Sequence, residues 1–496
     1  MVETTDLSKL LAEHPEWLLV REMGRTFALG TDEIEVAASG KKSHFGFLDD
    51  NGFHTWRLNG FEIVDGGELR IDVAGAFGKK RETMRLVPRT AAAELTAQIE
   101  LARLEKANEI ARLITDSFAG VKLGRVALNA ENGRLAQILF DMDGRPMSAI
   151  ADITGSLTVE PIFTASMLWL ERRLSLRKKA INEILVICEK RQAKNAQKLH
   201  ALLNDRWRAK IAICEINRKA DPSVLVELPK RKIRELWREK AQKLKLPERA
   251  QPSDAASGIL ALSPESTDII FSRQGETVRF AGLPFARVRT VMGKERAWFG
   301  IGKERRMLDS DSSDELVSLA NKLISHRAAD AANKRHQYYR TAPEAWLESI
   351  LRRNIKLLDA NLILSPIYNQ FRSSNDKIDL LALRRDGRLV IIELKTQPDR
   401  EMIFQAVDYW RKIELQRRRG ILAAANLFDG REILDKPALI YLAAPAWSFH
   451  RDFEFFARTV SPEIELWRFE LHEHWRRQVK VLARKSYASE PGGTNL

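Results

Sequence analysis

Glu393 and Lys395 are charged residues at the end of an apolar run, residues 388–395, that has the composition of a buried strand. A buried charge needs a partner or a function, because its transfer out of water is costly unless it is paired. Successive side chains of a strand alternate between its two faces. Glu393 and Lys395 are therefore expected to share one face, with Leu394 pointing to the other.

A second carboxylate, Asp379, lies in the preceding apolar run, residues 377–385. An Asp-Gly pair that ends at Gly387 separates the two runs and predicts a β-hairpin. A two-residue turn would place Asp379 opposite Leu394, whereas a three-residue loop with its glycine in the left-handed bulge position would place Asp379 opposite Glu393. We predict the three-residue loop. Two carboxylates then converge across a strand pair, which is how an oxygen-ligand site for Mg²⁺ is built.

An amphipathic helix that positions a third acid is expected upstream, over residues 343–358, where proline occupies the first position. Glu344 and Glu348 are the two acids on this helix that could face the site. Counting about 100° per residue, Glu344 falls closer to the centre of the apolar stripe. We predict Glu344 as the acid of the site, with Glu348 as the alternative.

A second amphipathic helix is expected downstream, over residues 399–418. Gln405 and Tyr409 are four residues apart, so they lie together at the edge of its apolar stripe. Together with the hairpin and the upstream helix, this helix completes an ordered set of polar residues. The set consists of Glu344, Asp379, Glu393, Lys395, Gln405 and Tyr409.

This ordered set resembles the motifs of the PD-(D/E)xK nuclease superfamily, and most of all its RecB-like and archaeal NucS-like (EndoMS) branches. The resemblance covers about residues 341–485, and Ile378 stands where the family has a proline. It implies a restriction-endonuclease-like mixed sheet flanked by helices. It also implies a nuclease that hydrolyses phosphodiester bonds of DNA in repair, recombination or defence against foreign DNA.

The resemblance also implies roles for the site residues. Asp379, Glu393 and the Leu394 carbonyl would bind Mg²⁺ or Mn²⁺. Lys395 would orient the attacking water and help to deprotonate it, and Glu344 would hold a second metal or a water. The two polar residues of the downstream helix would position the nucleic-acid backbone or the ligands.

Two other functions stay open. An inactive copy of the fold could serve as a nucleic-acid-binding or assembly protein, but such copies tend to lose the acidic residues and the lysine, which are intact here. An RNA-cleaving nuclease would keep the chemistry and change the substrate. The sequence has no RRM, KH or dsRBD signature that supports RNA.

The chain has 496 residues, which is too long for one compact domain, and a formal charge of +14 that attracts polyanions. No run of 18 apolar residues occurs, and the acidic start does not resemble a signal peptide. We therefore expect a cytoplasmic protein without membrane contact, which could form a homo-oligomer. Cys188 and Cys214 have no partner at zinc spacing and are expected to be reduced core residues.

The predicted fold class is α/β (α+β) and multidomain, with β-rich and basic helical regions before the nuclease domain. The predicted divisions are a β-rich α+β region (1–162), a basic helical region (163–250), a small β-rich segment with a connecting helix (251–340), the nuclease domain (341–485) and a disordered tail (486–496).

Residues 171–250 hold nearly all of the charge surplus, with 23 Lys and Arg against 10 Asp and Glu. Clustered basic side chains are suited to following phosphates along a nucleic acid, although a solvated basic face is the alternative. We predict this stretch as the main DNA contact. The candidate contact residues are Arg172, Arg173, Arg177, Lys178, Lys179, Lys230, Arg231 and Lys232.

Overall fold

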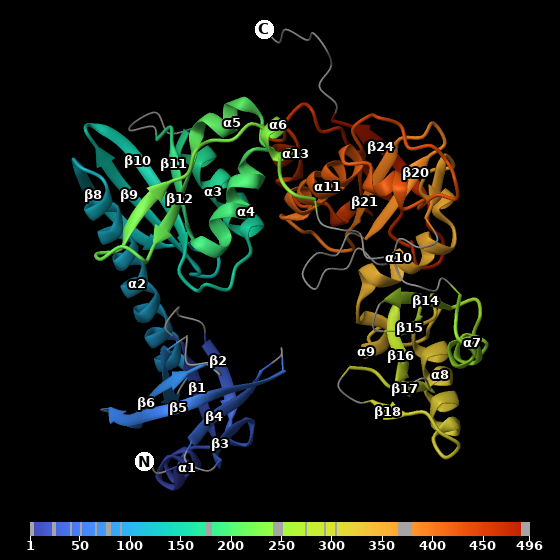
Figure 1. Cartoon of the computed structure of the whole chain (residues 1–496), viewed down its shortest axis with the longest axis horizontal. Helices are drawn as coiled ribbons and strands as arrows, with labels where there is room; N and C mark the ends of the chain where they lie inside the picture. The colour runs from blue at the N-terminus through green and yellow to red at the C-terminus, as the bar shows by residue number, and fades with distance from the viewer. Residues whose placement is uncertain are drawn as a thin grey trace. The chain divides into compact units, whose positions relative to one another are not determined.

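The computed structural model describes residues 4–21, 26–39, 42–49, 52–64, 67–75, 81–89, 92–174, 181–241, 251–272, 275–291, 294–302, 305–365 and 379–487. These residues form four β-sheets with helices between them (Figure 1), which agrees with the predicted α+β multidomain class. The chain divides into two compact units, residues 1–197 with 209–230, and residues 198–208 with 231–496. None of the described helices is long and apolar enough to cross a membrane.

The first unit begins with α1 (Thr4–Ala12) and an antiparallel sheet in the order β2-β1-β7-β6-β5-β4-β3. Period-two patterns in the strands bury one face, as in β7, where Met84 and Leu86 are buried. The strands are β1 (Glu16–Val20), β2 (Thr26–Gly30), β3 (Ile34–Ser39), β4 (Lys42–Asp49), β5 (Gly52–Val64), β6 (Glu68–Ala74) and β7 (Arg81–Pro88), with the 3-10 helix η1 (Thr31–Glu33) before β3.

A long helix, α2 (Ala92–Ser117), leads from this sheet into a mixed sheet in the order β13-β12-β11-β10-β9-β8. Ile110 and Ile114 of α2 pack on one face of the sheet. On the other face, α3 (Val159–Leu174) contacts β10 and β11. The remaining elements are β8 (Val121–Leu128), β9 (Leu135–Met142), β10 (Arg145–Asp152), β11 (Ile184–Glu189), α4 (Lys190–His200), α5 (Asp205–Lys210), β12 (Ile211–Asn217) and β13 (Val224–Glu227).

The prediction of a basic helical region over residues 163–250 is wrong, because this stretch contains β11, β12 and β13 of the mixed sheet. The predicted boundary after residue 162 falls inside α3, between two strands of one sheet. β11 and β12 are parallel strands that are buried on both faces, so their sequences are continuous apolar runs without alternation. Short runs of this kind do not distinguish a strand from a buried helix, and the surrounding basic residues favoured a helix.

The second unit contains an antiparallel meander in the order β14-β15-β16-β17-β18, which occupies the predicted β-rich segment 251–340 (Figure 1). A short helix, α7, precedes the meander, and Ser253 caps it by accepting a hydrogen bond from Ala256 N. The elements are α6 (Ile233–Leu236), α7 (Asp254–Leu260), β14 (Thr267–Ser272), β15 (Gly275–Phe280), β16 (Leu283–Val291), β17 (Lys294–Phe299), β18 (Arg306–Met307), α8 (Ser313–His326) and α9 (Gln337–Arg340).

A second mixed sheet follows in the order β19-β20-β21-β22-β23-β24. It continues to residue 486, one residue past the predicted domain end, and the predicted tail from residue 488 onward lies outside the described residues. The elements are α10 (Pro343–Arg353), η3 (Ile355–Leu357), β19 (Leu362–Leu364), β20 (Leu380–Arg384), β21 (Leu389–Leu394), α11 (Met402–Arg418), α12 (Ile421–Ala424), β22 (Leu439–Pro445), η5 (Ala446–Ser448), α13 (Phe453–Ala457), β23 (Leu466–Leu471) and β24 (Val481–Ser486).

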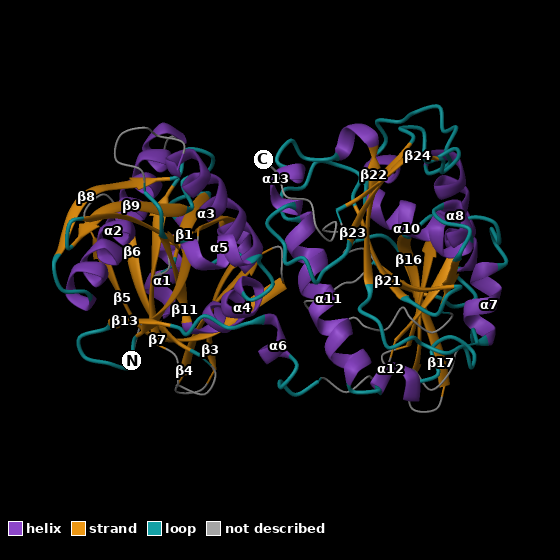
Figure 2. Cartoon of the chain, turned by 90° about the horizontal axis from the view of Figure 1, so that it is seen from above, coloured by secondary structure: helices purple, strands orange, loops and turns teal. Residues whose placement is uncertain are grey.

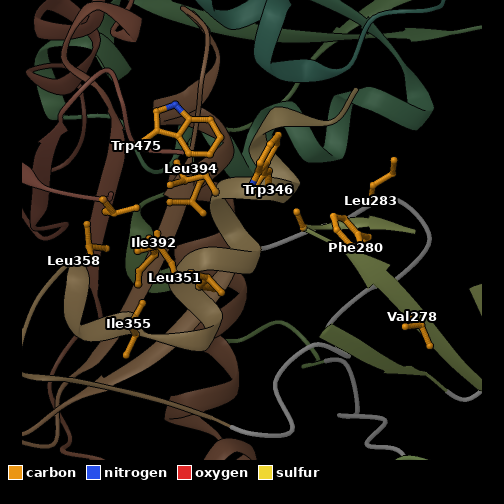
Figure 3. Close-up of a cluster of buried hydrophobic side chains, with 14 of the residues drawn as sticks. Val278, Phe280, Leu283, Trp346, Leu351, Ile355, Leu358, Ile392, Leu394 and Trp475 are labelled. Carbon is orange, nitrogen blue, oxygen red and sulfur yellow. The ribbon is translucent and has the colours of Figure 1, made fainter. Parts of the chain in front are cut away.

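Helices cover both faces of this sheet, with α10 on one side of β21 and α11 on the other (Figure 2). Figure 3 shows Trp346 and Leu351 of α10 between Ile392 of β21 and Phe280 of the meander, within one continuous apolar core. This core fixes α10 against the sheet. Glu393, on the opposite face of β21, lies on the side of α11.

The two mixed sheets have the same strand order and the same directions. In each, the first three strands pair antiparallel, the next two pairs are parallel, and the last strand is antiparallel again. The third strand is β10 in the first sheet and β21 in the second. Both sheets are also preceded by a helix that packs on the corresponding face, α2 or α10.

Candidate active site

The β20–β21 hairpin has the predicted three-residue loop, in which Arg384 N donates to Arg388 O. Gly387 adopts a left-handed φ of 83°, which favours glycine over other residues. Leu380 pairs with Ile392, and the next pair in this register is Asp379 with Glu393. The predicted loop and register are therefore confirmed.

Glu393 is a buried carboxylate, with 3% of its surface exposed, and its Oε2 atom has no hydrogen-bond partner among the residues that the structure describes. Burial, and then the negative charge of Asp379, raise the pKa of Glu393 well above its ordinary value. Asp379 Oδ2 accepts a hydrogen bond of 2.8 Å from Leu394 N, so this carboxylate is held against the peptide that follows Glu393. The arrangement is costly for the folded protein unless a cation or a proton joins it.

Lys395 lies on the same face as Glu393, with its Nζ 3.2 Å from Glu393 Oε1. The same Nζ is 2.9 Å from Asp399 Oδ2 and donates a 2.8 Å hydrogen bond to Gln405 Oε1. Burial lowers the pKa of Lys395, but the charges of Glu393 and Asp399 outweigh burial, and the resulting pKa is above the ordinary value. Lys395 is therefore a fixed, protonated cation between three oxygen atoms.

Asp399 is a site residue that the sequence analysis missed. Burial raises the pKa of Asp399, but Lys395 outweighs burial and holds this pKa below its ordinary value. Burial, followed by the hydrogen bond and the charge of Asp399, raises the pKa of the neighbouring Glu401 to about 6. The spacing of four residues between Lys395 and Asp399 was the available signal, but the intervening segment has no periodic pattern that predicts a contact.

Glu344 and Glu348 lie on the same helix, but their side chains have different neighbours. Glu344 is half-buried in the first turn of α10, and its charge raises the pKa values of both Glu393 and Lys395. Glu348 is 2% exposed and instead forms an ion pair of 3.2 Å with Arg279. Glu344 is thus the helix acid whose charge acts on the hairpin site.

The start of α10 is anchored by Arg327, whose guanidinium is buried and donates to main-chain carbonyls. These include the carbonyls of Thr341 and Ala342, the two residues before α10. Ala342 has a left-handed φ of 46° and caps the helix that Pro343 begins. Burial, and then the charge of Arg476, lower the pKa of Arg327 to about 9. This network fixes the position from which Glu344 extends.

The two polar residues of α11 have different surroundings. Gln405 accepts the hydrogen bond from Lys395 and so helps to fix this ammonium group. Tyr409, one turn further along, is half-buried, with Lys412 Nζ 5.6 Å from its ring centroid. Gln405 therefore belongs to the charged cluster around Lys395.

The predicted DNA-contacting residues are spread over both compact units. Arg172 and Arg173 end α3, and the guanidinium of Arg173 lies 5.8 Å from the ring centroid of Trp169. Lys230 donates to a main-chain carbonyl within the first unit. Arg231 and Lys232 directly precede α6, in the second unit. The predicted contact residues Arg177, Lys178 and Lys179 lie outside the described residues, and so does Ile378.

The first mixed sheet carries different residues at the corresponding places. Asp152, the last residue of β10, is the acid at the end of the third strand in this sheet, and it pairs with Leu135. Thr154 follows it at the same spacing as Lys395 follows Glu393. The Asp152 carboxylate accepts hydrogen bonds from Thr154 N (2.9 Å), Thr154 Oγ1 (2.8 Å) and Leu157 N (3.0 Å), so its oxygens are used within the turn.

Other candidate sites among the described residues are less suited to hydrolysis. Cys188 and Cys214 are buried free thiols, as predicted, and burial raises the pKa of each to about 12. No group of three or more His, Cys, Asp and Glu side chains in the described ranges is placed to hold a metal ion. A cavity of about 360 Å³ lies at the hairpin-loop end of the second mixed sheet, with Arg384, Asp386 and Tyr441 in its lining, and contains none of the predicted site residues.

Comparisons of the chain with protein-family models, with curated proteins and with solved structures gave no match. The function must therefore be argued from the chemistry of Asp379, Glu393, Lys395 and Glu344 and from the sheet that positions them.

Proposed function

We propose that this chain is a divalent-metal-dependent nuclease that hydrolyses phosphodiester bonds of DNA, with its active site at the end of β21 in a restriction-endonuclease-like domain. The observation that carries the proposal is the buried Glu393, which lies opposite Asp379 and beside Lys395. Its Oε2 has no hydrogen-bond partner within the described part of the chain. A folded protein keeps such an arrangement at a cost in stability, and functional sites are where this cost is commonly found.

The residues at this position fit Mg²⁺ or Mn²⁺. Both are hard cations that prefer oxygen ligands and are commonly bound by one or two carboxylates together with water and substrate phosphate. Asp379, Glu393 and the carbonyl of Leu394 would hold the ion, and Glu344 would hold a second ion or a water. A bound cation would acidify its water and neutralise charge on the phosphate.

The side chains of the chain itself supply orientation and charge. The protonated Lys395 provides a positive charge where negative charge develops on the phosphate during hydrolysis. Asp399 and Gln405 restrict its Nζ to one position, which lowers the reorganisation needed during the reaction. The hydrogen bond from Leu394 N to Asp379 fixes that carboxylate relative to Glu393. These contacts favour an orienting and charge-stabilising role for Lys395.

The proposal is tested by incubating the purified chain with single-stranded, duplex, flapped and mismatched DNA, with Mg²⁺ and with EDTA. We expect Mg²⁺-dependent cleavage of at least one substrate. Asp379→Ala should abolish cleavage while DNA binding stays largely intact, because the contacts with phosphate lie elsewhere.

A protein that binds these DNAs but cuts none of them would instead be a nucleic-acid-binding protein with an inactive nuclease fold. Cleavage of RNA alone would keep the site chemistry and change the substrate. Equal loss of binding and cleavage in Asp379→Ala would indicate a misfolded variant.

A further inference from the structure

Trp447 is an unusually exposed aromatic residue. It has 85% of its surface exposed, whereas the next most exposed large apolar side chains in the described ranges, Ile63 and Leu101, have 61%. Aromatic side chains usually bury most of their large apolar surface. An indole ring left in water at this level is therefore a candidate contact for a ligand.

The ring is located at the edge of the sheet that carries the proposed active site. β21 and β22 are parallel, so their carboxyl ends meet at one edge, and Lys395 N donates to Ala443 O (3.1 Å). Trp447 follows β22 directly, in η5. The next residue, Ser448, donates through Oγ to the carbonyl of Thr396 (3.0 Å), which is the residue after Lys395. Trp447 thus lies one residue from a direct contact with the catalytic segment.

The main chain at Trp447 is held in place although its ring is exposed. Trp447 N donates to Glu473 Oε1 (2.9 Å), on the loop that follows β23. Together with the Ser448 contact, this bond fixes η5 to both neighbouring segments at the same edge. A rigid backbone with an exposed ring loses little conformational entropy when a flat partner stacks on it.

The two loops that Trp447 joins carry exposed cations as well as acids. Arg451 follows η5, has 78% of its side chain exposed and lies 3.9 Å from Asp452. The loop between β23 and β24 carries the exposed Arg477 and Lys480 besides Glu473. An exposed aromatic ring on loops that carry cations suits single-stranded nucleic acid, because the ring stacks on a base while the cations contact phosphates.

We propose that Trp447 stacks on an unpaired base beside the scissile phosphate, and that the enzyme consequently prefers DNA with unpaired bases at the cut. In a paired duplex the faces of each base are covered by its neighbours, so the ring gains a partner only where a base is unstacked. Single strands, flaps and mismatched duplexes meet this condition. The proposal rests on the nuclease function proposed above.

The test is a binding measurement by fluorescence anisotropy with a labelled single strand and with the matching duplex, in EDTA so that no cleavage occurs. Trp447→Ala should weaken single-strand binding by roughly 5- to 100-fold, the range expected for the loss of one base–aromatic stack, and should change duplex binding by less than about 2-fold. Trp447→Phe keeps a ring and should retain most of the single-strand affinity. Ile324→Ala, which removes a 43%-exposed side chain on α8, is the matched control and should change neither affinity.

Unchanged single-strand affinity in Trp447→Ala would overturn the proposal and would leave the ring as a contact for a protein partner. Equal weakening for the single strand and the duplex would also overturn it.

The stacking proposal and the nuclease proposal fail in different ways. If the parent protein cuts no DNA but the single-strand effect of Trp447→Ala remains, the nuclease function fails. If the parent protein cuts DNA and Trp447→Ala keeps the parent's preference for DNA with unpaired bases, the stacking proposal fails.

Discussion

The two mixed sheets of this protein share their strand order and directions, but they differ at the end of the third strand. In the second sheet, Glu393 is buried opposite Asp379, and one of its oxygens has no hydrogen-bond partner in the described ranges. In the first sheet, Asp152 lies opposite Leu135 and its oxygens are occupied by hydrogen bonds within its own turn. The same framework thus holds a buried cluster of charges in one case, and in the other a turn whose own groups form hydrogen bonds with the acid.

This difference separates the requirements of the fold from those of the chemistry. The first sheet folds without paired acids and without a lysine, so the strand order does not require them. The cluster of the second sheet raises the pKa of Glu393 through burial and the charge of Asp379, which costs stability. We infer that the cluster is retained for a function that the first sheet does not perform.

A large expected effect that separates the two sheets is on catalysis. Lys395→Met removes the cation that we propose lies beside the reacting phosphate, and it should lower the cleavage rate by about 10²- to 10³-fold. The corresponding change in the first sheet, Thr154→Val, should leave the rate unchanged. Single-turnover cleavage with saturating Mg²⁺ measures both. A rate that falls equally in the two variants would mean that both sheets contribute to one site.

A buried ion network is expected to have the next largest effect, on stability. Arg279 is 1% exposed and pairs with Asp268 (2.7 Å) and Glu348 (3.2 Å), which joins the β14–β18 meander to α10. Asp268→Asn leaves the buried arginine incompletely paired and should lower the free energy of unfolding by about 3–5 kcal/mol. The change is measured from the unfolding transition of the second unit in denaturant. A loss below about 1 kcal/mol would show that Arg279 is satisfied without Asp268.

This network also predicts the sign of a pH dependence. Burial raises the pKa of Asp268, but Arg279 outweighs burial and holds it below the ordinary value. A lowered pKa in the folded state contributes stability above the ordinary pKa of about 4, and this contribution is lost as the pH falls through the folded value. The free energy of unfolding of the parent protein should therefore fall more steeply below pH 4 than that of Asp268→Asn. Parallel curves would contradict the assignment.

The sequence predicted the local geometry of the site better than the division into domains. The Asp-Gly signal predicted the hairpin, and the three-residue loop was predicted because it places the two carboxylates, Asp379 and Glu393, opposite each other. β11 and β12 were missed because their short apolar runs have no period. The ion pair of Glu348 with Arg279 joins residues 69 positions apart, and no local pattern could predict it. Trp447 likewise gave no signal, because its importance comes from exposure and from its place at the sheet edge.

The smallest expected effect concerns the basic stretch of residues 171–250. Charge reversal of Arg172, Arg177 and Lys178 to Glu should weaken DNA binding several-fold at low salt for all sequences alike. Each lost phosphate contact should reduce the slope of log K against log salt by about 0.9.

The matched control for this charge reversal is a second triple variant, in which three basic residues of another surface are changed to Glu. Arg289, Lys294 and Arg296 are exposed on the β16–β17 hairpin, and their reversal to Glu should leave the salt slope unchanged. If the variant with Arg172, Arg177 and Lys178 changed to Glu keeps the parent protein's slope of log K against log salt, these residues form a solvated face outside the contact surface.

The central claim is that one of the two similar sheets carries a metal-dependent active site. The most direct test is the Mg²⁺-dependent cleavage rate of Glu393→Gln compared with Asp152→Asn, using the DNA that the parent protein cuts. Glu393→Gln replaces the carboxylate that we propose binds the metal by an amide and should lower the rate by at least about 10³-fold. The Asp152→Asn variant should cut at the parental rate. Cleavage by Glu393→Gln at the parental rate, or its loss in Asp152→Asn, would contradict the account.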